Sequence, residues 1–248
     1  RIELKRYDMI PIYGDRIRNM RIVEPYKVSF DFGTKILNND SHIKVGIYPS
    51  YIYRNLSIKA NIESFVSPSG NDLDNYWDDG FDLLDKLSIN YSYYRNKNQM
   101  YFNFGPMEDV SFASGYMINR ISNNIDYPRK INSGLNLKYI FDTDFMDLNI
   151  LIPSIRDFGN NGGIISARTS LYISHNFPLT LGLGLIVDIN QFSDISESLN
   201  KNVKERSVYG AEIDFNYNLI SDLDFDVNIF SEFVGLWYPE YNYYLLFD

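Results

Sequence analysis

Acidic residues recur at alternating positions in three late segments of the chain, 179–189, 209–219 and 223–233, and could together form a carboxylate-lined surface. They are Asp188, Glu212, Asp214, Asp224, Asp226 and Glu232. Basic residues take comparable places in earlier segments, namely Lys59, Lys138 and Arg168. Carboxylate patches favour cations in a pore, whereas in a filled interior the same groups would form ion pairs. The residue pattern leaves both roles open.

Other candidates for chemistry are weak. His42 and His175 are the only histidines, and neither has an evident serine and acid partner for a catalytic triad. Both are therefore interpreted as surface turn residues. The acidic stretch 71–82 lacks the ligand spacing of an EF-hand and is interpreted as a solvated loop. The glycines of 159–163 precede no helix that would bind phosphate. The chain has no cysteine, which removes disulfides, thiolate metal sites and cysteine nucleophiles. Since the other candidates are also weak, we expect no enzyme activity, metal or cofactor.

The segments that carry these residues alternate between apolar and polar positions, which is typical of β-strands with two different faces. In 179–189 the odd positions are all Leu, Val or Ile, while Gly, Thr and Asp occupy most of the even positions. Pro49 interrupts one segment, so its bounds are a weaker prediction. About twelve strands are predicted, at 26–36, 43–53, 56–65, 87–94, 100–104, 134–141, 147–152, 165–174, 179–189, 209–219, 223–233 and 241–247.

Short and long connections alternate along this series of strands. Tight turns are predicted near 143–144, 175–178 and 220–222, and long loops at 66–86, 105–132, 153–164 and 190–208. Aromatic residues gather toward the strand ends, and no apolar run approaches the length of a membrane-spanning helix. A β-sandwich has no reason to sort its loops in this way, whereas a transmembrane barrel has.

These features resemble the class of bacterial outer-membrane β-barrels over nearly the whole chain. The final segment, ending at Phe247 and Asp248, is similar to the C-terminal signal of that class, except that the aromatic residue is penultimate. This departure leaves open a truncated chain, and Arg1 in place of Met indicates a processed or trimmed one. The resemblance implies an all-β fold, a closed antiparallel barrel of about twelve strands in residues 25–248, located in the bacterial outer membrane. Residues 1–24 would form a periplasmic tail or a plug.

Charge and loop composition limit the functions to be considered. The net charge of −9 argues against nucleic-acid binding. We expect an outer-membrane channel for passive or substrate-selective passage of small polar solutes or ions, with a preference for cations. The alternative is a non-conducting binding or structural protein, such as an adhesin, a receptor or a subunit of an envelope complex. The loop 105–132 contains several apolar residues and is predicted to fold inward, to cap the barrel, or to extend the flanking strands.

Overall fold

The computed structural model describes ten stretches of the chain, and all structural statements below refer to them. They are residues 25–37, 40–66, 80–113, 115–124, 132–141, 145–174, 177–191, 206–221, 226–238 and 244–247. The predicted tail or plug at 1–24, the acidic stretch 71–82 up to Asp79, Asp224 and His175 therefore lie outside the described residues.

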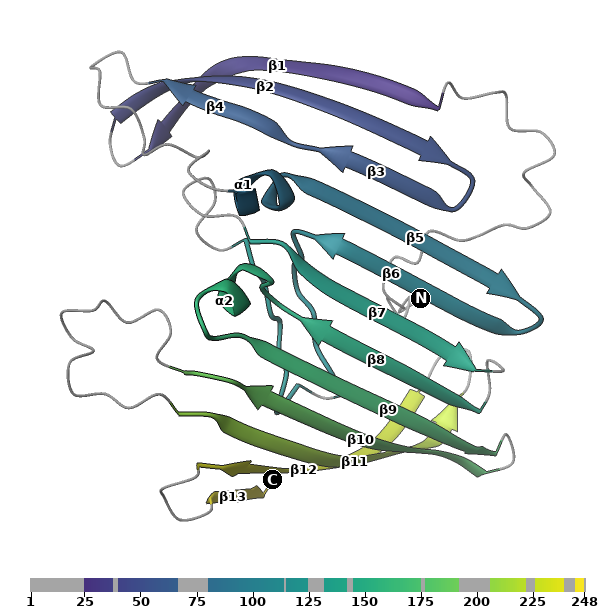
Figure 1. Cartoon of the computed structure of the whole chain (residues 1–248). Coiled ribbons are helices and arrows are strands. Elements are labelled where there is room, and N and C mark those ends of the chain that lie inside the picture. Colours follow the sequence, from purple (N-terminus) through teal and green to yellow (C-terminus); the bar gives the residue numbers. More distant parts are fainter. Residues whose placement is uncertain are drawn as a thin grey trace.

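The described residues form thirteen β-strands in a single antiparallel sheet, with two short helices in the connections (Figure 1). The helices are α1 (Gly80–Asp85) and α2 (Arg156–Gly159). The strands are β1 (Tyr26–Leu37), β2 (Asp40–Tyr53), β3 (Leu56–Ala60), β4 (Ile62–Val66), β5 (Leu87–Arg95), β6 (Asn98–Gly105), β7 (Gly134–Phe141), β8 (Met146–Ile152), β9 (Ile164–Ser174), β10 (Phe177–Asp188), β11 (Val208–Ser221), β12 (Asp226–Trp237) and β13 (Tyr244–Phe247).

Each strand pairs with the next one in sequence, except that β3 and β4 both pair with β2. They continue one another on either side of Asn61, so the sheet has twelve strand positions, as the sequence predicts. The break lies opposite Pro49, which has no N–H to donate, and the N–H of Asn61 instead bonds to the carbonyl of Lys86 on the far side, at 2.8 Å. No hydrogen bonds between β1 and β13 close the sheet in the described residues.

One predicted strand bound is wrong near the C-terminal end of the chain. Strand β12 extends to Trp237, beyond the predicted end at residue 233, because its pairing with β11 continues to Tyr209. The alternation fails there since Val234 and Leu236 are apolar residues on the face that is otherwise polar. Strand β13 covers Tyr244–Phe247 of the predicted strand 241–247, whose first three residues lie outside the described residues.

The connections separate into two sets at opposite ends of the strands, as the sequence predicts. In Figure 1 the β2–β3 and β5–β6 turns lie on the right, whereas the connections that carry α1 and α2 lie on the left, where the adjoining ends of β1 and β2 also lie. The turn between β5 and β6 is made by Asn96 and Lys97, which both have positive φ values of 49° and 69°. Two such residues in succession form the type I′ turn, whose twist matches that of paired strands.

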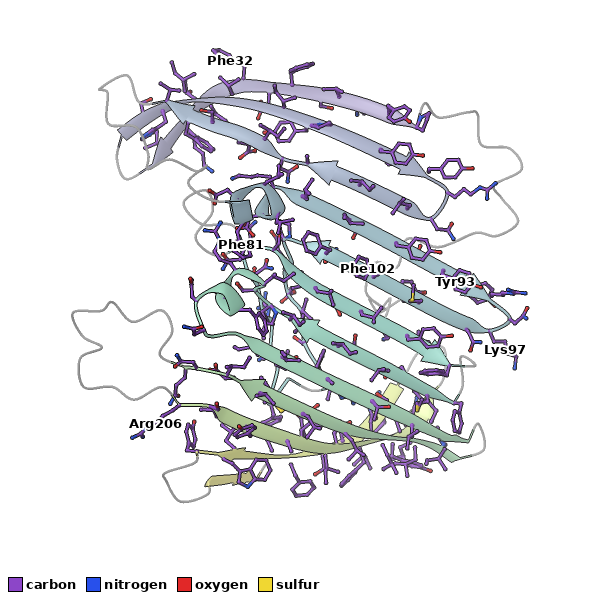
Figure 2. All side chains as sticks on the ribbon, viewed as in Figure 1. Phe32, Phe81, Tyr93, Lys97, Phe102 and Arg206 are labelled. Carbon is purple, nitrogen blue, oxygen red and sulfur yellow. The ribbon has the colours of Figure 1, made fainter. Side chains whose placement is uncertain are left out.

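The two faces of the sheet differ sharply in polarity. Cross-strand partners share a face, so the pairing registers assign every strand residue to one side. On one side, here called the outer face, the strand residues described are apolar or uncharged apart from Arg95 at the turn end of β5. Large hydrophobic side chains on this face are exposed, such as Phe32 at 78% and Leu185 at 62% (Figure 2).

The opposite side, here called the inner face, carries the charged strand residues and is the more buried of the two. Thirteen polar or charged residues are buried among the described residues, against six hydrophobic ones. A water-soluble fold normally shows the reverse distribution. The apolar positions predicted from the alternation are therefore the exposed ones, and the polar positions face the interior.

Aromatic side chains gather on the outer face at the tight-turn end. Tyr26 on β1 contacts Tyr51 on β2 with ring centroids 4.9 Å apart, and Tyr139 contacts Phe141 on β7 at 4.3 Å. The amphipathic tyrosine ring suits a boundary between apolar and aqueous surroundings.

The outer face of β10 provides a direct test of the predicted lipid contact. Leu183 lies near the middle of this strand and is 50% exposed. Replacement by arginine (Leu183→Arg) should destabilise the protein folded in lipid vesicles. Its free energy of unfolding should fall by about 2–4 kcal/mol, because the variant places a charge near the hydrocarbon midplane. A reversible urea titration in vesicles measures the change. The matched control is Thr180→Arg on the inner face of the same strand, and equal losses for both variants would contradict the assignment of faces.

Candidate functional site: the inner face of the sheet

The most extensive charged cluster on the inner face centres on Arg168 of β9. Its Nη2 lies 2.8 Å from Oδ2 of Asp214, and its Nε lies 3.2 Å from Oε1 of Glu212, both on β11. Arg168 also donates to the hydroxyl of Ser170 at 2.6 Å. Since β10 lies between β9 and β11, the guanidinium must cross a whole strand to reach these carboxylates.

Two glycines of β10 make this crossing possible. Gly182 is paired with Ser170 and Asp214, and Gly184 is paired with Arg168 and Glu212. A Cβ atom at Gly182 would overlap the Arg168 guanidinium and the Asp214 carboxylate, and one at Gly184 would lie 2.5 Å from Oε1 of Glu212. The Leu-Gly-Leu-Gly-Leu sequence of β10 therefore combines an apolar outer face with an inner face that is open enough for an ion pair to span it.

The connection between β6 and β7 forms a small hairpin, here called the inner hairpin (residues 106–124). Val110 and Ile121 exchange backbone hydrogen bonds of 3.0 and 2.8 Å, and the N–H of Phe112 bonds to the carbonyl of Ile118. At its base, the Asn123 side chain accepts from the N–H of Met107 at 2.7 Å and donates to the carbonyl of Pro153 at 2.8 Å. The segment thus has defined structure of its own.

The inner hairpin packs against the inner face, which is one of the placements predicted for the loop. Met107, Phe112 and Ile118 are almost fully buried together with Leu151 of β8, and Ile186 of β10 borders the cluster. Further along, the N–H of Tyr116 donates to Oε1 of Glu232 on β12 at 3.1 Å. This apolar packing explains why hydrophobic side chains occur in so long a loop.

The strands β5 to β8 present mainly neutral polar groups. Asn103 donates to Asn90 at 2.6 Å, and Tyr101 donates to Gln99 at 2.5 Å. The side-chain oxygens of Asn136 and Asn149 are buried and have no hydrogen-bond partner among the described residues, and ordered water is the usual partner of such groups.

Three further ion pairs, in two groups, connect neighbouring strands of this face. Lys44 of β2 lies 3.0 Å from Asp31 and 3.1 Å from Glu63, which also accepts from the Tyr48 hydroxyl at 2.6 Å. Asp147 of β8 accepts from Tyr172 at 2.9 Å, and Lys138 of β7 approaches it at 3.9 Å. The sequence shows the charges on each strand, but the pairing follows only from the register.

A separate cluster joins three connections at the long-loop end. Arg156 of α2 pairs with Asp82 at 2.5 Å and Asp85 at 2.8 Å, both in α1. Asp85 also accepts from the N–H of Ser133 at 2.6 Å.

Burial raises the pKa of Asp85 and lowers the pKa of the neighbouring Lys86, since each charged form loses hydration. The sequence analysis interpreted residues 71–82 as a solvated loop and missed this cluster.

The predicted site residues are brought together only in part. Arg168, Glu212, Asp214 and Glu232 lie on neighbouring strands of one sector, with Asp188 at the end of β10 in the same sector, whereas Lys59 and Lys138 lie apart from it. Asp226 belongs to β12 without a described side chain, and Asp224 lies outside the described residues. Their roles in lining a pore remain predictions.

The prediction that His42 is a surface turn residue is wrong. His42 pairs with Lys35 of β1 within the ladder, and its side chain is buried on the inner face at 3% exposure. The strand β2 begins earlier than the alternation suggests, because its pairing with β1 continues to Asp40. No group of three or more His, Asp or Glu side chains in the described part of the chain could hold a metal ion.

Comparison with known proteins gives no relative for this arrangement. No known protein family matches the chain, and no curated protein or solved structure is significantly similar to it. No helix in the described residues is long and apolar enough to cross a membrane.

The open inner surface of β10 leads to a prediction about stability. Replacing Gly182 by alanine (Gly182→Ala) should destabilise the fold by about 1–3 kcal/mol, because the added methyl group displaces a buried ion pair from a packed position. The matched control is Gly33→Ala on the inner face of β1, where a Cβ would meet no atom within 4 Å. Urea titrations of the two variants in vesicles should separate them, and similar stabilities would contradict the close packing at β10.

The Arg156 cluster leads to a local prediction. Arg156→Met keeps the length of the side chain but leaves two carboxylates without their cation, so α1 should open more easily by about 1–3 kcal/mol. Hydrogen exchange of the amides at 80–86 and 132–133 measures this change. The conservative variant Arg156→Lys should lose less, and unchanged exchange in Arg156→Met would show that the cluster does not hold α1.

Proposed function

We propose that this chain is a transmembrane β-barrel of the bacterial outer membrane and forms a channel for small polar solutes. The observation that carries this proposal is the inverted polarity of the sheet. Its outer face exposes large hydrophobic side chains across the strands, and Arg95 is the one charged residue at an outer strand position among those described. In water such a surface would aggregate, whereas hydrocarbon solvates it favourably.

The free strand edges support closure of the sheet into a barrel. Along β1 the backbone groups that point away from β2 have no strand partner in the described residues, and each unsatisfied group in hydrocarbon would cost several kcal/mol. Strand β1 runs from the tight-turn end to the long-loop end, and β13 runs in the opposite direction (Figure 1). Their pairing would therefore be antiparallel and would close an even-numbered barrel.

The inner face supports a hydrated interior. The described residues on β5 to β8 offer partly exposed amides, hydroxyls and one lysine, together with buried amide oxygens that lack a protein partner. These groups need water or a polar solute within reach. A lumen lined in this way would let small polar molecules exchange their hydration shell for side-chain contacts, which is how barrel pores pass solutes.

The runner-up is a non-conducting binding or structural protein of the same membrane. The packing of the inner hairpin favours it, because Met107, Phe112 and Ile118 fill part of the interior with an apolar core. A barrel of about twelve strands is intermediate between those filled by side chains and those with a wide channel. The two functions differ in one measurable property: the purified channel would conduct ions across a bilayer, and the binding or structural protein would not.

A cysteine-substitution experiment in planar bilayers tests the channel. The chain contains no cysteine, so a single introduced thiol reports on one position. Asn103→Cys on the inner face of β6 should give a conductance that falls in discrete steps when a bulky water-soluble thiol reagent is added.

The neighbouring variant Phe104→Cys, on the outer face, provides the matched control and should be unaffected. A folded protein that never conducts would refute the channel and favour the runner-up. Equal block in both variants would contradict the assignment of faces.

A further inference from the structure

We propose that the inner hairpin sets the charge selectivity of the pore by covering carboxylates on β11 and β12, so that lysines dominate the accessible lining and small anions are preferred. This inference rests on the proposed channel function. It replaces the cation preference expected from the sequence, which assumed that all inner carboxylates reach the solution.

Burial separates the two signs of charge on the inner face. Of the seven described carboxylates on inner strand positions, five are buried, namely Glu63, Asp147, Glu212, Asp214 and Glu232. The other two are Asp31 and Asp188. Among the six cations on the same face, Arg168 has only 11% of its side chain exposed, whereas none of the five lysines is buried: Lys27, Lys35, Lys44, Lys59 and Lys138. Carboxylates thus outnumber cations at the described inner strand positions, whereas most of the charged side chains that stay accessible there are lysines.

The inner hairpin accounts for the covered sector on β11 and β12. Its Tyr116 donates to Glu232, whose own exposure is only 2%. Around Gly210 of β11, Met117 of the hairpin lies close to Ile186 and Leu236. Val234 lies on β12 between Glu232 and Leu236, opposite Glu212, and is itself 6% exposed. The inner hairpin therefore lies against the inner face of β11 and β12.

Three of the four remaining inner carboxylates are engaged by partners of their own, and the fourth, Asp188, lies at the last position of β10. Glu63 and Asp31 share Lys44, and Asp147 is engaged by Tyr172 and Lys138. By contrast, the Lys138 side chain is still 36% exposed, and Lys59 and Lys27 are exposed. Aqueous ions screen charges beyond about 8 Å at physiological salt, so a passing solute responds mainly to the groups that it can approach. Those groups are mostly ammonium ions.

The first test measures reversal potentials in a salt gradient for the full chain and two variants. One variant replaces residues 107–123 by a short Gly-Ser linker. The other, Phe112→Ser with Ile118→Ser, keeps the hairpin length but removes its apolar anchors, in case the deletion fails to fold. We expect the full chain to prefer chloride over potassium and both variants to shift toward potassium. Cation preference in the full chain, or unchanged selectivity in a folded variant, would overturn the inference.

The second test uses thiol reactivity and does not depend on conduction. Val234→Cys should be protected in the full chain and should react at least about tenfold faster when the hairpin is removed or loosened. Ser88→Cys, opposite Lys59 in the ladder, should react faster with an anionic than with a cationic reagent in all backgrounds, by a factor on the order of ten for a local potential of a few kT.

The two tests distinguish the failure of each proposal. A folded protein that does not conduct refutes the channel, and the Val234→Cys rates then still decide whether the hairpin covers this sector. Equal reactivity of Val234→Cys with and without the hairpin overturns the inference even if the channel conducts. A preference of Ser88→Cys for the cationic reagent would overturn it as well.

Discussion

In the proposed barrel, a charged side chain at a lipid-facing strand position would cost roughly 2–4 kcal/mol near the bilayer midplane, and the distribution of charge over the two faces of the sheet avoids that cost. All charge on the central parts of the strands is placed on one face. Because strand residues alternate, the other half of the strand positions must then be uncharged and mostly apolar, and exposed side chains such as Phe32 and Leu185 lie there. Among the described strand residues, only Arg95, at a tight turn, is a charged residue on the outer face.

The same constraint concentrates charge inside, where it must be paired or hydrated. Arg168 provides the clearest solution, since it reaches across β10 to the carboxylates of β11 over two glycines. On β1, β2 and β4 a lysine is shared by two carboxylates. The inner hairpin adds an apolar core to this polar interior and removes part of the acidic wall from solution. Fold stability and the electrostatics of the lumen therefore depend on the same few contacts.

The sequence predicted the all-β fold, the twelve strand positions and the sorting of tight turns from long loops, because an alternating pattern of period two is local and needs no partner to be recognised. Pro49 made the predicted bounds of β2 less certain. The pairing of β2 with β1 nevertheless continues past Pro49, because the N–H that proline lacks would face the gap between β3 and β4. The bounds at Asp40 and Trp237 were missed because they are set by pairing rather than by alternation.

The candidate site was predictable only as a set of charged positions. Which charges meet depends on the register between strands, and which remain accessible depends on the inner hairpin. Gly184 illustrates the difference: from its lumen-facing position alone, replacement by serine is expected to be tolerated, yet Glu212 occupies the space that the side chain would need. The cation preference likewise followed from the composition of β10 to β12, without knowledge that Glu212 and Glu232 are covered.

The central claim is that hydrocarbon, not water, solvates the outer face. Quenching of a single tryptophan by lipids brominated along their acyl chains tests it most directly, in a chain whose Trp77 and Trp237 are replaced by phenylalanine. Tryptophan placed at Leu183 should be strongly quenched after folding into such vesicles, whereas tryptophan placed at Thr180, on the inner face of the same strand, should be quenched weakly. Strong quenching at both positions, or at neither, would contradict the account.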